Sequence, residues 1–176
     1  DRSVSRGLGD VYKRQEEVDI KMLISQVVKK LTPIANAKDI VIYVDNHQAE
    51  FSPILLDYDK MYEAIYNIAD NAIKYSPEGG FVHIDITADN DYLTIKIEDN
   101  GPGIPEDERD RIFERFYRLD DSRARDTGGT GLGLAITKEA VLMHNGTIDV
   151  ANVSDIGSVF TIRLPYKITI GGQNEK

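Results

Sequence analysis

The 176-residue sequence contains no cysteine, which excludes disulfides and cysteine-ligated zinc and fits a reducing compartment. Basic residues are also few, since 21 lysines and arginines stand against 30 aspartates and glutamates, for a net charge of −9. A field of that sign argues against a nucleic-acid partner, which needs a basic face. No apolar run approaches the roughly 20 residues of a membrane span, and no secretory leader is recognisable, so we expect no direct membrane contact from these residues.

Histidine is scarce as well. The three histidines, His47, His83 and His144, are scattered along the chain and lack the spacing of metal ligands. His83 is predicted to be a surface residue of a strand, and His144 a polar residue at the end of a helix. No Ser/His/Asp arrangement is evident, so the sequence does not indicate nucleophilic catalysis.

The length suits one compact domain, which at this size buries enough surface to be stable without disulfides or structural metal ions. Residues 1–15 show neither a helical nor a strand period and are expected to be a flexible leader that need not be native to the domain. Residues 16–166 are predicted to form the domain, and residues 167–176 a polar tail. There are no internal repeats.

Apolar spacing predicts three helices. Asp19 can cap the first, whose apolar positions run from Ile20 to Leu31. Asp59 is predicted to cap the second, which ends at residues 76–80. The third, residues 132–144, is apolar on most sides and is therefore expected to be buried. The core face of the second helix is expected to contain Tyr62, Ile65, Tyr66, Ala69, Ala72 and Ile73.

Strands are predicted at residues 40–44 and, from alternating apolar residues, in two hairpins that pair 82–88 with 93–97 and 147–153 with 159–164. The fold class that follows is α+β: a two-layer α/β sandwich with a mixed, mainly antiparallel sheet and about three helices on one face. The charged segment 105–130 has only a short helical piece near 106–116. Such a long irregular stretch is unusual unless it is functional, and a lid over a ligand is the usual reason.

Asn67 and Asn71 lie four residues apart on the second helix, away from its apolar stripe, and Lys74 and Tyr75 follow. Asparagine is unfavourable inside a helix, so the pair needs an explanation. A carboxamide oxygen is a suitable ligand for Mg²⁺, which shares its remaining positions with water and phosphate. A solvated face would explain the asparagines alone, but Lys74 one turn later favours a triphosphate site.

Asp99 ends an alternating strand and is followed by Asn-Gly-Pro-Gly. A tight turn explains this motif as well as a binding site does. In the second interpretation Gly101 and Gly103 form a wall without side chains against which a flat ring can lie. The carboxylate at its edge can then accept a hydrogen bond from an exocyclic amine.

Two further motifs follow. Phe113, Phe116 and Tyr117 are interspersed with charged residues up to Arg118. This pattern is typical of a helix docked on the core. It is also typical of a mobile lid, which its aromatic residues would anchor and whose arginine would reach a phosphate. Residues 129–134 read Gly-Thr-Gly-Leu-Gly-Leu and lead into a helix, whose amides can cradle a polyphosphate. This is neither the lysine-bearing phosphate loop nor the dinucleotide fingerprint.

In this order and spacing, the motifs closely resemble the catalytic ATP-binding domain of bacterial sensor histidine kinases, within the superfamily of gyrase, MutL and heat-shock chaperone ATPases. Residues 67–77 look like the family's N box and 99–104 like its first glycine box. Residues 113–118 resemble its F box and 129–134 its second glycine box. The similarity extends from about Val18 to Pro165 and implies the Bergerat-type fold.

The resemblance implies roles for the matching residues. Asn71 would bind Mg²⁺, Asn67 would support the phosphates, and Lys74 and Arg118 would contact phosphate, which makes Asn67, Lys74 and Arg118 the catalytic set. Tyr75 would flank the base and Asp99 would bind the adenine amino group. The remaining ATP-binding residues implied by the motifs are Gly101, Gly103, Ile104, Phe113, Gly129, Thr130, Gly131, Leu132, Gly133 and Leu134.

The implied activity is that of a protein histidine kinase in two-component signal transduction, with ATP and Mg²⁺ as cofactors. The family's phosphoacceptor histidine lies on a dimerising helical hairpin, and nothing here resembles that hairpin. We therefore expect a monomeric catalytic fragment whose partners are the histidine-bearing dimerisation domain of its parent kinase and a response regulator receiver domain. The resemblance implies a cytoplasmic location, beneath a parent anchored in the cell membrane.

The sequence leaves three alternatives open. An ATP-gated clamp or hydrolase of the same superfamily would carry a water-activating glutamate one turn before the magnesium asparagine, where this chain has Asn67. An anti-sigma-factor-type serine kinase shares the pocket but resembles this lid poorly. A degenerate domain that only binds ATP or docks proteins would not need all four motifs filled.

Overall fold

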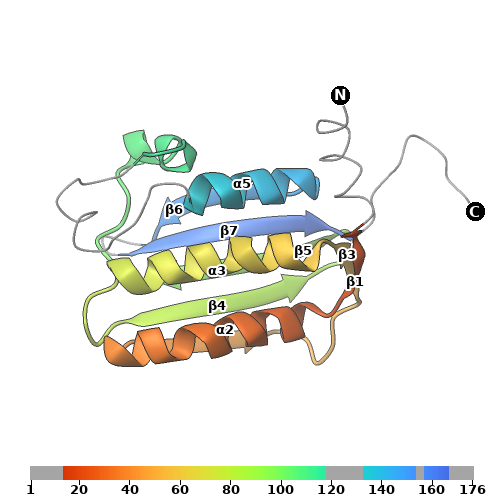
Figure 1. Cartoon of the computed structure of the whole chain (residues 1–176), viewed down its shortest axis with the longest axis horizontal. Coiled ribbons are helices and arrows are strands. Elements are labelled where there is room, and N and C mark those ends of the chain that lie inside the picture. Colours follow the sequence, from red (N-terminus) through yellow and green to blue (C-terminus); the bar gives the residue numbers. More distant parts are fainter. Residues whose placement is uncertain (1–13, 118–132, 154–156, 167–176) are drawn as a thin grey trace, which may run out of the picture.

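The computed structural model describes residues 14–117, 133–153 and 157–166 (Figure 1). A five-stranded sheet with the strand order β2-β4-β5-β7-β6 forms one layer, and helices of the described ranges cover one of its faces. The helices are α2 (Ile20–Ala37), α3 (Tyr58–Tyr75) and α5 (Gly133–Met143), and the strands are β2 (Val41–Asn46), β4 (Phe81–Ala88), β5 (Tyr92–Asp99), β6 (Thr147–Asn152) and β7 (Ser158–Pro165). The predicted two-layer α+β sandwich is confirmed.

The sheet is mixed but mainly antiparallel, as predicted. The β4–β5 and β6–β7 hairpins pair antiparallel and β5 joins them by pairing antiparallel with β7, whereas β2 pairs parallel with β4. Alternation decides which face each side chain occupies. The inward side chains of β4 and β5 are almost fully buried beneath the helices: Val82, Ile84, Ile86, Leu93, Ile95 and Ile97.

The helix caps agree with the sequence prediction at one helix and not at the other. Asp19 caps α2, as predicted, and its carboxylate accepts hydrogen bonds from the backbone N–H groups of Lys21 and Met22. The predicted cap of α3 was wrong: Asp57 is the N-cap and accepts from the N–H of Lys60, while Asp59 lies inside the first turn. A negative charge in the first turn still interacts favourably with the helix dipole. The sequence pattern alone therefore fits either aspartate as the cap.

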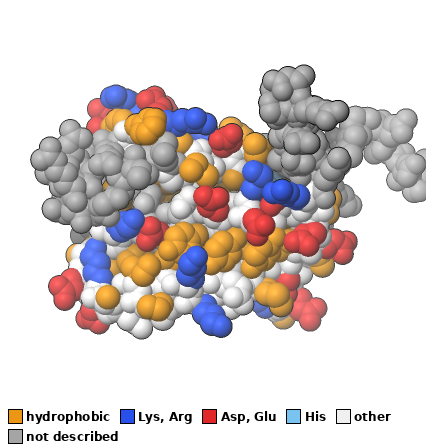
Figure 2. Space-filling model, viewed as in Figure 1, with side chains coloured by type: hydrophobic (Ala, Val, Ile, Leu, Met, Phe, Trp, Pro, Cys, Tyr) orange, Lys and Arg blue, Asp and Glu red, His pale blue; other side chains and the backbone are white. Residues whose placement is uncertain are grey.

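Helix α3 lies between α2 and α5 in the helical layer (Figure 1). Tyr62 and Tyr66, which were predicted to face the core, are only half-buried, and Met61, Ala64 and Ile68 take the fully buried positions. Tyr58, Tyr62 and Tyr66 stack along the outer side of α3 with ring centroids 6.0 and 6.3 Å apart. Figure 2 shows hydrophobic side chains gathered in a band across this face.

Three features depart further from the sequence prediction. The helical piece near 106–116 consists of two short 3₁₀ turns, η1 (Glu106–Glu108) and η2 (Arg111–Phe113). Helix α5 is not buried on most sides, because Ile136 is 39% exposed and Leu142 55%. A small antiparallel sheet of β1 (Glu16–Val18) and β3 (Ile54–Leu56) was not predicted.

Within the described ranges, no helix combines the length and hydropathy that crossing a bilayer would need.

Candidate nucleotide site

Asp99 lies at the end of β5 and is only 5% exposed. Its Oδ1 accepts a hydrogen bond from the backbone N–H of Gly101 at 2.8 Å, and its Oδ2 accepts one from the Ser158 hydroxyl at 2.9 Å. Burial raises the pKa of Asp99, and these hydrogen bonds oppose that shift because they favour the ionised form. The result is a buried carboxylate whose two oxygens are each held by a donor.

Gly101 lies between this carboxylate and the end of α3. A Cβ at Gly101 would lie 2.8 Å from the Tyr75 carbonyl oxygen and 2.9 Å from Asp99 Oδ1, so only glycine fits without displacement. The Gly101 carbonyl accepts a 2.6 Å hydrogen bond from the N–H of Gly157. Three chain segments, at Tyr75, Asp99 to Gly101 and Gly157, therefore meet at one point.

Asn152, at the end of β6, holds the next part of the glycine-rich turn. Its Oδ1 accepts a 2.9 Å hydrogen bond from the Ile104 N–H, and Ile104 itself is 6% exposed. Gly103 has a φ of +79°, and a Cβ there would lie 3.2 Å from the Asn152 side chain. The turn after Asp99 is thus held on both sides, by Asn152 and by Gly157.

The polar face of α3 carries Asn67, Asp70, Asn71 and Lys74 at spacings of three and four residues, all of them half-buried. The Lys74 ammonium lies 3.0 Å from Asp70 Oδ2, one turn earlier. Lys38 completes the end of this helix, since its ammonium donates to the carbonyl oxygens of Ile73 and Lys74 at 2.9 and 2.7 Å. Burial lowers the pKa of Lys38.

The other end of the polar face meets α5. The Asn67 side-chain amide donates a 3.4 Å hydrogen bond to the Gly133 carbonyl at the first residue of α5. The Thr137 hydroxyl, fully buried, lies 2.9 Å from the same carbonyl and 3.2 Å from that of Ala64 on α3. Leu134 packs, half-buried, against the core. The beginning of α5 is therefore fixed beside Asn67.

These contacts define a site with two ends. Tyr75, Gly101 and Asp99 meet at the carboxyl end of α3, and Asn67 meets Gly133 eight residues earlier. At 1.5 Å per residue the two ends are about 12 Å apart along the helix. One end of the site therefore offers the Asp99 carboxylate and the glycine backbone at Gly101. The other end offers amide groups and the N-terminus of α5.

Phe113 lies apart from this wall. Its ring packs edge-on against Phe160 with centroids 6.2 Å apart, and the Lys138 ammonium lies 5.3 Å from its centre. Phe113 therefore anchors the start of the charged segment on the core, whereas Phe116 is 72% exposed and does not. The remaining predicted site residues lie outside the described residues: Arg118, Gly129, Thr130, Gly131 and Leu132.

Four residues that shape the site were missed by sequence reasoning: Lys38, Asn152, Gly157 and Ser158. Each acts across the fold, through a partner 35 or more residues away in the chain. Asn152 ends β6, and Gly157 and Ser158 lead into β7, in a polar stretch whose composition signals only a turn. No local signal could have connected them with Asp99.

The fold is that of a family of nucleotide-binding ATPases. Residues 56–168 match the family described as histidine kinase-, DNA gyrase B- and HSP90-like ATPase, and the chain belongs to this family. Within it, the chain is similar to sensor histidine kinases. Sensor histidine kinase WalK of Bacillus subtilis is 46% identical over 114 residues, which are 64% of this chain and 19% of that protein.

Solved structures agree. The mycobacterial sensor histidine kinase MprB is 33% identical with a TM-score of 0.73, over 86% of this chain and 97% of that one. Full-length ShkA in complex with AMPPNP is 31% identical with a TM-score of 0.75, over 86% of this chain and 31% of that one. The chain is thus similar to the ATP-binding catalytic domain of sensor histidine kinases. It spans only about a fifth of the length of WalK.

Proposed function

We propose that this chain binds Mg²⁺–ATP between α3 and the loop after β5, and transfers the γ-phosphoryl group to a histidine on a separate domain. The observation that carries the proposal is the buried Asp99 carboxylate, oriented by Gly101 and Ser158 beside the end of α3. A carboxylate acceptor beside a glycine-rich turn would select a base with an exocyclic amine, as adenine has. The AMPPNP complex of the similar protein ShkA supports an adenine nucleotide.

The phosphates would then lie toward Asn67, Asn71 and the N-terminus of α5, where backbone amides and the helix dipole favour negative charge. Asn71 would supply a neutral oxygen to Mg²⁺, which would neutralise phosphate charge when bound. Lys74 would reach phosphate by leaving its pairing with Asp70, which holds it ready on the same helix face. We assign Arg118 and the glycines at 129 and 131 to the phosphates from their motifs alone.

The transfer itself would break the bond between the γ-phosphorus and its bridging oxygen, which leaves as ADP. A lone pair of the acceptor imidazole would form the new phosphorus–nitrogen bond, and the proton on its other ring nitrogen would be released to water. The protein's part is to position the nucleotide and to neutralise charge. Asn67 cannot act as a general base for water, since an amide does not accept a proton at neutral pH. We therefore expect slow hydrolysis and efficient transfer.

We propose residues 16–166 as the functional domain, part of a longer, membrane-anchored parent and monomeric on its own. ThkA, which shares the fold at 22% identity and a TM-score of 0.71, has been solved in complex with the response regulator protein TrrA. On this basis we propose that a response regulator's aspartate receives the phosphoryl group from the histidine.

The surface that receives the histidine-bearing domain is, we propose, the outer side of α5. Ile136 and Leu142 are exposed there, and Phe116 is exposed just after η2. The lining of an open groove between α5 and η2 contains neither Asp99 nor Asn71. The groove is lined by Phe113, Arg115, Ala135, Lys138, Glu139, Leu142 and Met143.

Leu142→Glu is expected to reduce phosphoryl transfer at least ten-fold while ATP affinity stays unchanged, because a charge would be placed in an apolar contact. The assay supplies the dimerisation domain of WalK separately and measures acid-labile, base-stable phosphate on it. Met22→Glu is the matched control, since Met22 is a 62% exposed apolar residue on α2. Equal transfer by both variants would place the acceptor surface elsewhere.

Asn71→Ala is expected to remove most of the Mg²⁺ dependence of ATP binding, because Asn71 is the proposed protein ligand. The measurement is the ratio of the ATP dissociation constants with Mg²⁺ and with EDTA, taken by calorimetry. Asn36→Ala is the control, since Asn36 is an exposed helical asparagine on α2. An unchanged ratio in the Asn71 variant would remove Asn71 from the metal site.

A further inference from the structure

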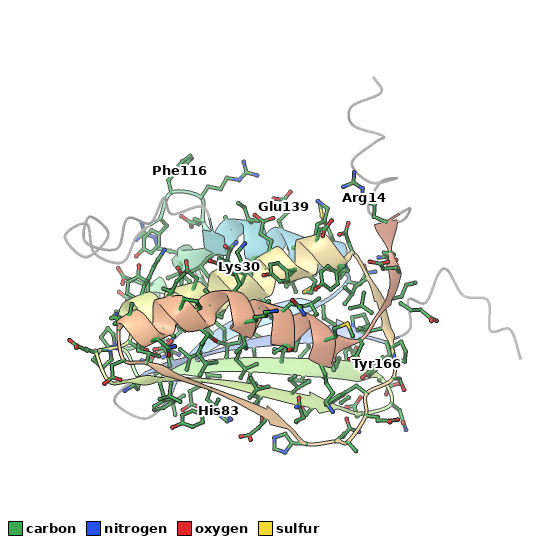
Figure 3. The ribbon with its side chains drawn as sticks, turned by 60° about the horizontal axis from the view of Figure 1, so that its bottom comes forward. Arg14, Lys30, His83, Phe116, Glu139 and Tyr166 are labelled. Atoms are coloured by element: carbon green, nitrogen blue, oxygen red, sulfur yellow. The ribbon has the colours of Figure 1, made fainter. Side chains whose placement is uncertain are left out.

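We propose a second metal site, for a divalent transition metal such as Zn²⁺, on the face of the sheet opposite the helices. Its ligands are Asp45, His83 and Asp85, with His47 beside them. Figure 3 shows His83 on the side of the sheet away from Lys30 and Glu139. The site is separate from the proposed nucleotide pocket, so each can fail without the other.

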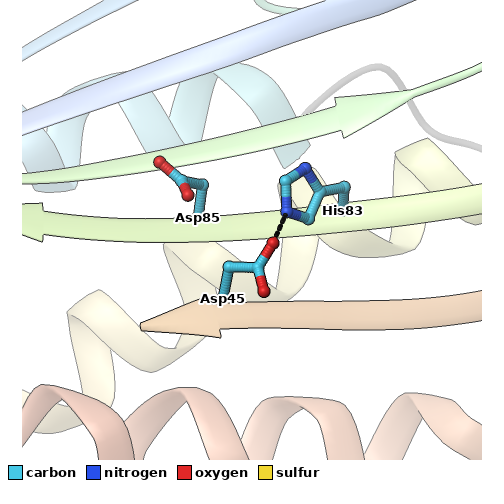
Figure 4. Close-up of side chains that lie close together, drawn as sticks. All are labelled: Asp45, His83 and Asp85. Atoms are coloured by element: carbon cyan, nitrogen blue, oxygen red, sulfur yellow. Dashed lines mark hydrogen bonds and ion pairs between the residues drawn. The ribbon is translucent and has the colours of Figure 1, made fainter. Parts of the chain in front are cut away.

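The strand register brings these side chains together. Parallel pairing of β2 with β4 places Tyr43 opposite His83 and Asp45 opposite Asp85, and alternation turns all of them to the helix-free face. One ligand atom each from Asp45, His83 and Asp85 lies within 4.8 Å of the others (Figure 4). Two neighbouring strands thus supply three ligands from a rigid part of the fold.

Each ring nitrogen of His83 faces a carboxylate. Its Nε2 lies 2.6 Å from Asp45 Oδ2, and its other nitrogen, Nδ1, faces Glu98 Oε2 of β5 at 4.0 Å. A ligating histidine usually directs its second ring nitrogen to a carboxylate, which fixes the tautomer and makes the ligand more basic. Glu98 would have this orienting role once the ion takes the Nε2 lone pair.

His47 can complete the set. It follows β2 directly, its backbone N–H bonds the carbonyl of Ile86, and its Nε2 contacts Asp85 Oδ1. Two imidazoles and two carboxylates make an N₂O₂ donor set that suits tetrahedral Zn²⁺. Around such an ion, ligand atoms lie about 3.4 Å apart at metal bonds of about 2.1 Å. The Asp45 and His47 side chains are exposed and can reorient to take these positions.

The charges facing the cluster favour a cation. Asp45, Asp85 and Glu98 are three carboxylates on adjacent strands, and Lys96, opposite Asp85 on β5, is the single basic residue in register with them. The neutral neighbours on this face are Tyr43, Thr87 and Thr94. Asp85 and His83 are largely covered, with side chains 20% and 29% exposed, so the pair forms the inner part of the site.

The composition of the chain makes this location testable. With no cysteine and only three histidines, a metal that requires imidazole or thiolate ligands can use only His47, His83 or His144. His144 is committed, since it is 4% exposed, its Nε2 accepts from the Asp57 N–H and its Nδ1 donates to the Ala140 carbonyl. A histidine-bound ion must therefore bind at the cluster on the sheet.

The experiment titrates the whole chain with Zn²⁺ in the absence of nucleotide, by calorimetry and by NMR of the three imidazoles. We expect one ion per chain, with the ring signals of His83 and His47 shifted and that of His144 unchanged. His83→Gln and Asp85→Asn are expected to weaken Zn²⁺ binding at least ten-fold. Glu98→Gln, which removes only the orienting carboxylate, is expected to weaken it ten- to a hundred-fold without abolishing it.

Asp149→Asn is the matched control. Asp149 lies on the same face and in the same cross-strand row as Asp85, through Thr161 and Lys96, but on the opposite edge strand. Its removal should leave Zn²⁺ affinity unchanged. Zn²⁺ should also raise the midpoint of thermal unfolding in the wild type and not in His83→Gln, because it binds only the folded chain. No saturable binding, or equal loss in Asp149→Asn and Asp85→Asn, would overturn the proposal.

Discussion

Asp99→Asn is expected to weaken ATP binding by roughly ten- to a hundred-fold, or about 1.5–3 kcal/mol, the value of a hydrogen bond to a charged group. The substitution is isosteric: the amide oxygen can still accept from the Gly101 N–H, and the amide NH₂ can donate to the Ser158 hydroxyl oxygen in place of the bond that Ser158 donates to the carboxylate. What changes is the charge of the acceptor that we propose for the adenine amine. Calorimetry with ATP measures the effect, and Asp91→Asn, in an exposed turn, controls for the lost negative charge.

The same variant should not destabilise the fold at neutral pH. Burial raises the pKa of Asp99 in the folded protein above its ordinary 3.8, so the folded state binds the proton more tightly than the unfolded state. The contribution of Asp99 to stability is therefore present below the ordinary pKa and is lost as pH rises through the raised one. Asp99→Asn removes this pH-dependent loss. A variant that binds ATP normally, or that unfolds readily at pH 7, would contradict the assignment.

Gly157→Ala is expected to have the largest effect on stability, at least about 3 kcal/mol, from strain and overlap together. Gly157 has a φ of +92°, and a Cβ there would lie 2.2 Å from the Asp99 carbonyl oxygen. The backbone at Asp99 would have to move, and the hydrogen bond from Gly157 to Gly101 would be lost with it. ATP affinity should fall as well, because the backbone at Asp99 and at Gly101 belongs to the proposed base pocket.

Gly79→Ala separates the two causes. Gly79 has a φ of +79°, but no atom lies within 4 Å of the position that a Cβ would take, so alanine there is strained without overlap. We expect a loss of about 1–2 kcal/mol and normal ATP affinity. Urea unfolding of both variants gives the comparison. Equal losses would mean that the chain beside Asp99 adapts easily, and that the pocket is less rigid than the contacts indicate.

The sequence predicted what depends on local periodicity. Alternation in residues 82–97 and 147–164 placed two hairpins close to their observed limits, and apolar spacing located α2 and α3. The cap of α3 was misplaced because Asp57 and Asp59 both precede the same apolar run, and the choice between them depends on where β3 ends at Leu56. The exposure of α5 was misjudged because composition does not show where a helix places its apolar side chains. A helix that is buried all round and a helix that exposes some of its apolar side chains have the same composition.

The site was predictable only where its motifs are local. Asp99, Gly101 and Asn67 stand in recognisable runs, whereas Ser158 and Asn152 reach them from a hairpin at least 48 residues away. The histidine cluster shows the same limit: nothing in the spacing of Asp45, His83 and Asp85 indicates a site until the parallel register of β2 and β4 is known. Long-range pairing, rather than residue type, decided both.

Calorimetric titration with ATP decides whether this chain has a working adenine nucleotide pocket. The titration is made with and without Mg²⁺, with GTP as the control and with circular dichroism to establish that the chain is folded. We predict saturable binding at one site, tighter with Mg²⁺, and much weaker binding of GTP, whose ring has a carbonyl where adenine has its amine. A folded chain that binds neither nucleotide, or binds both equally, would contradict the account.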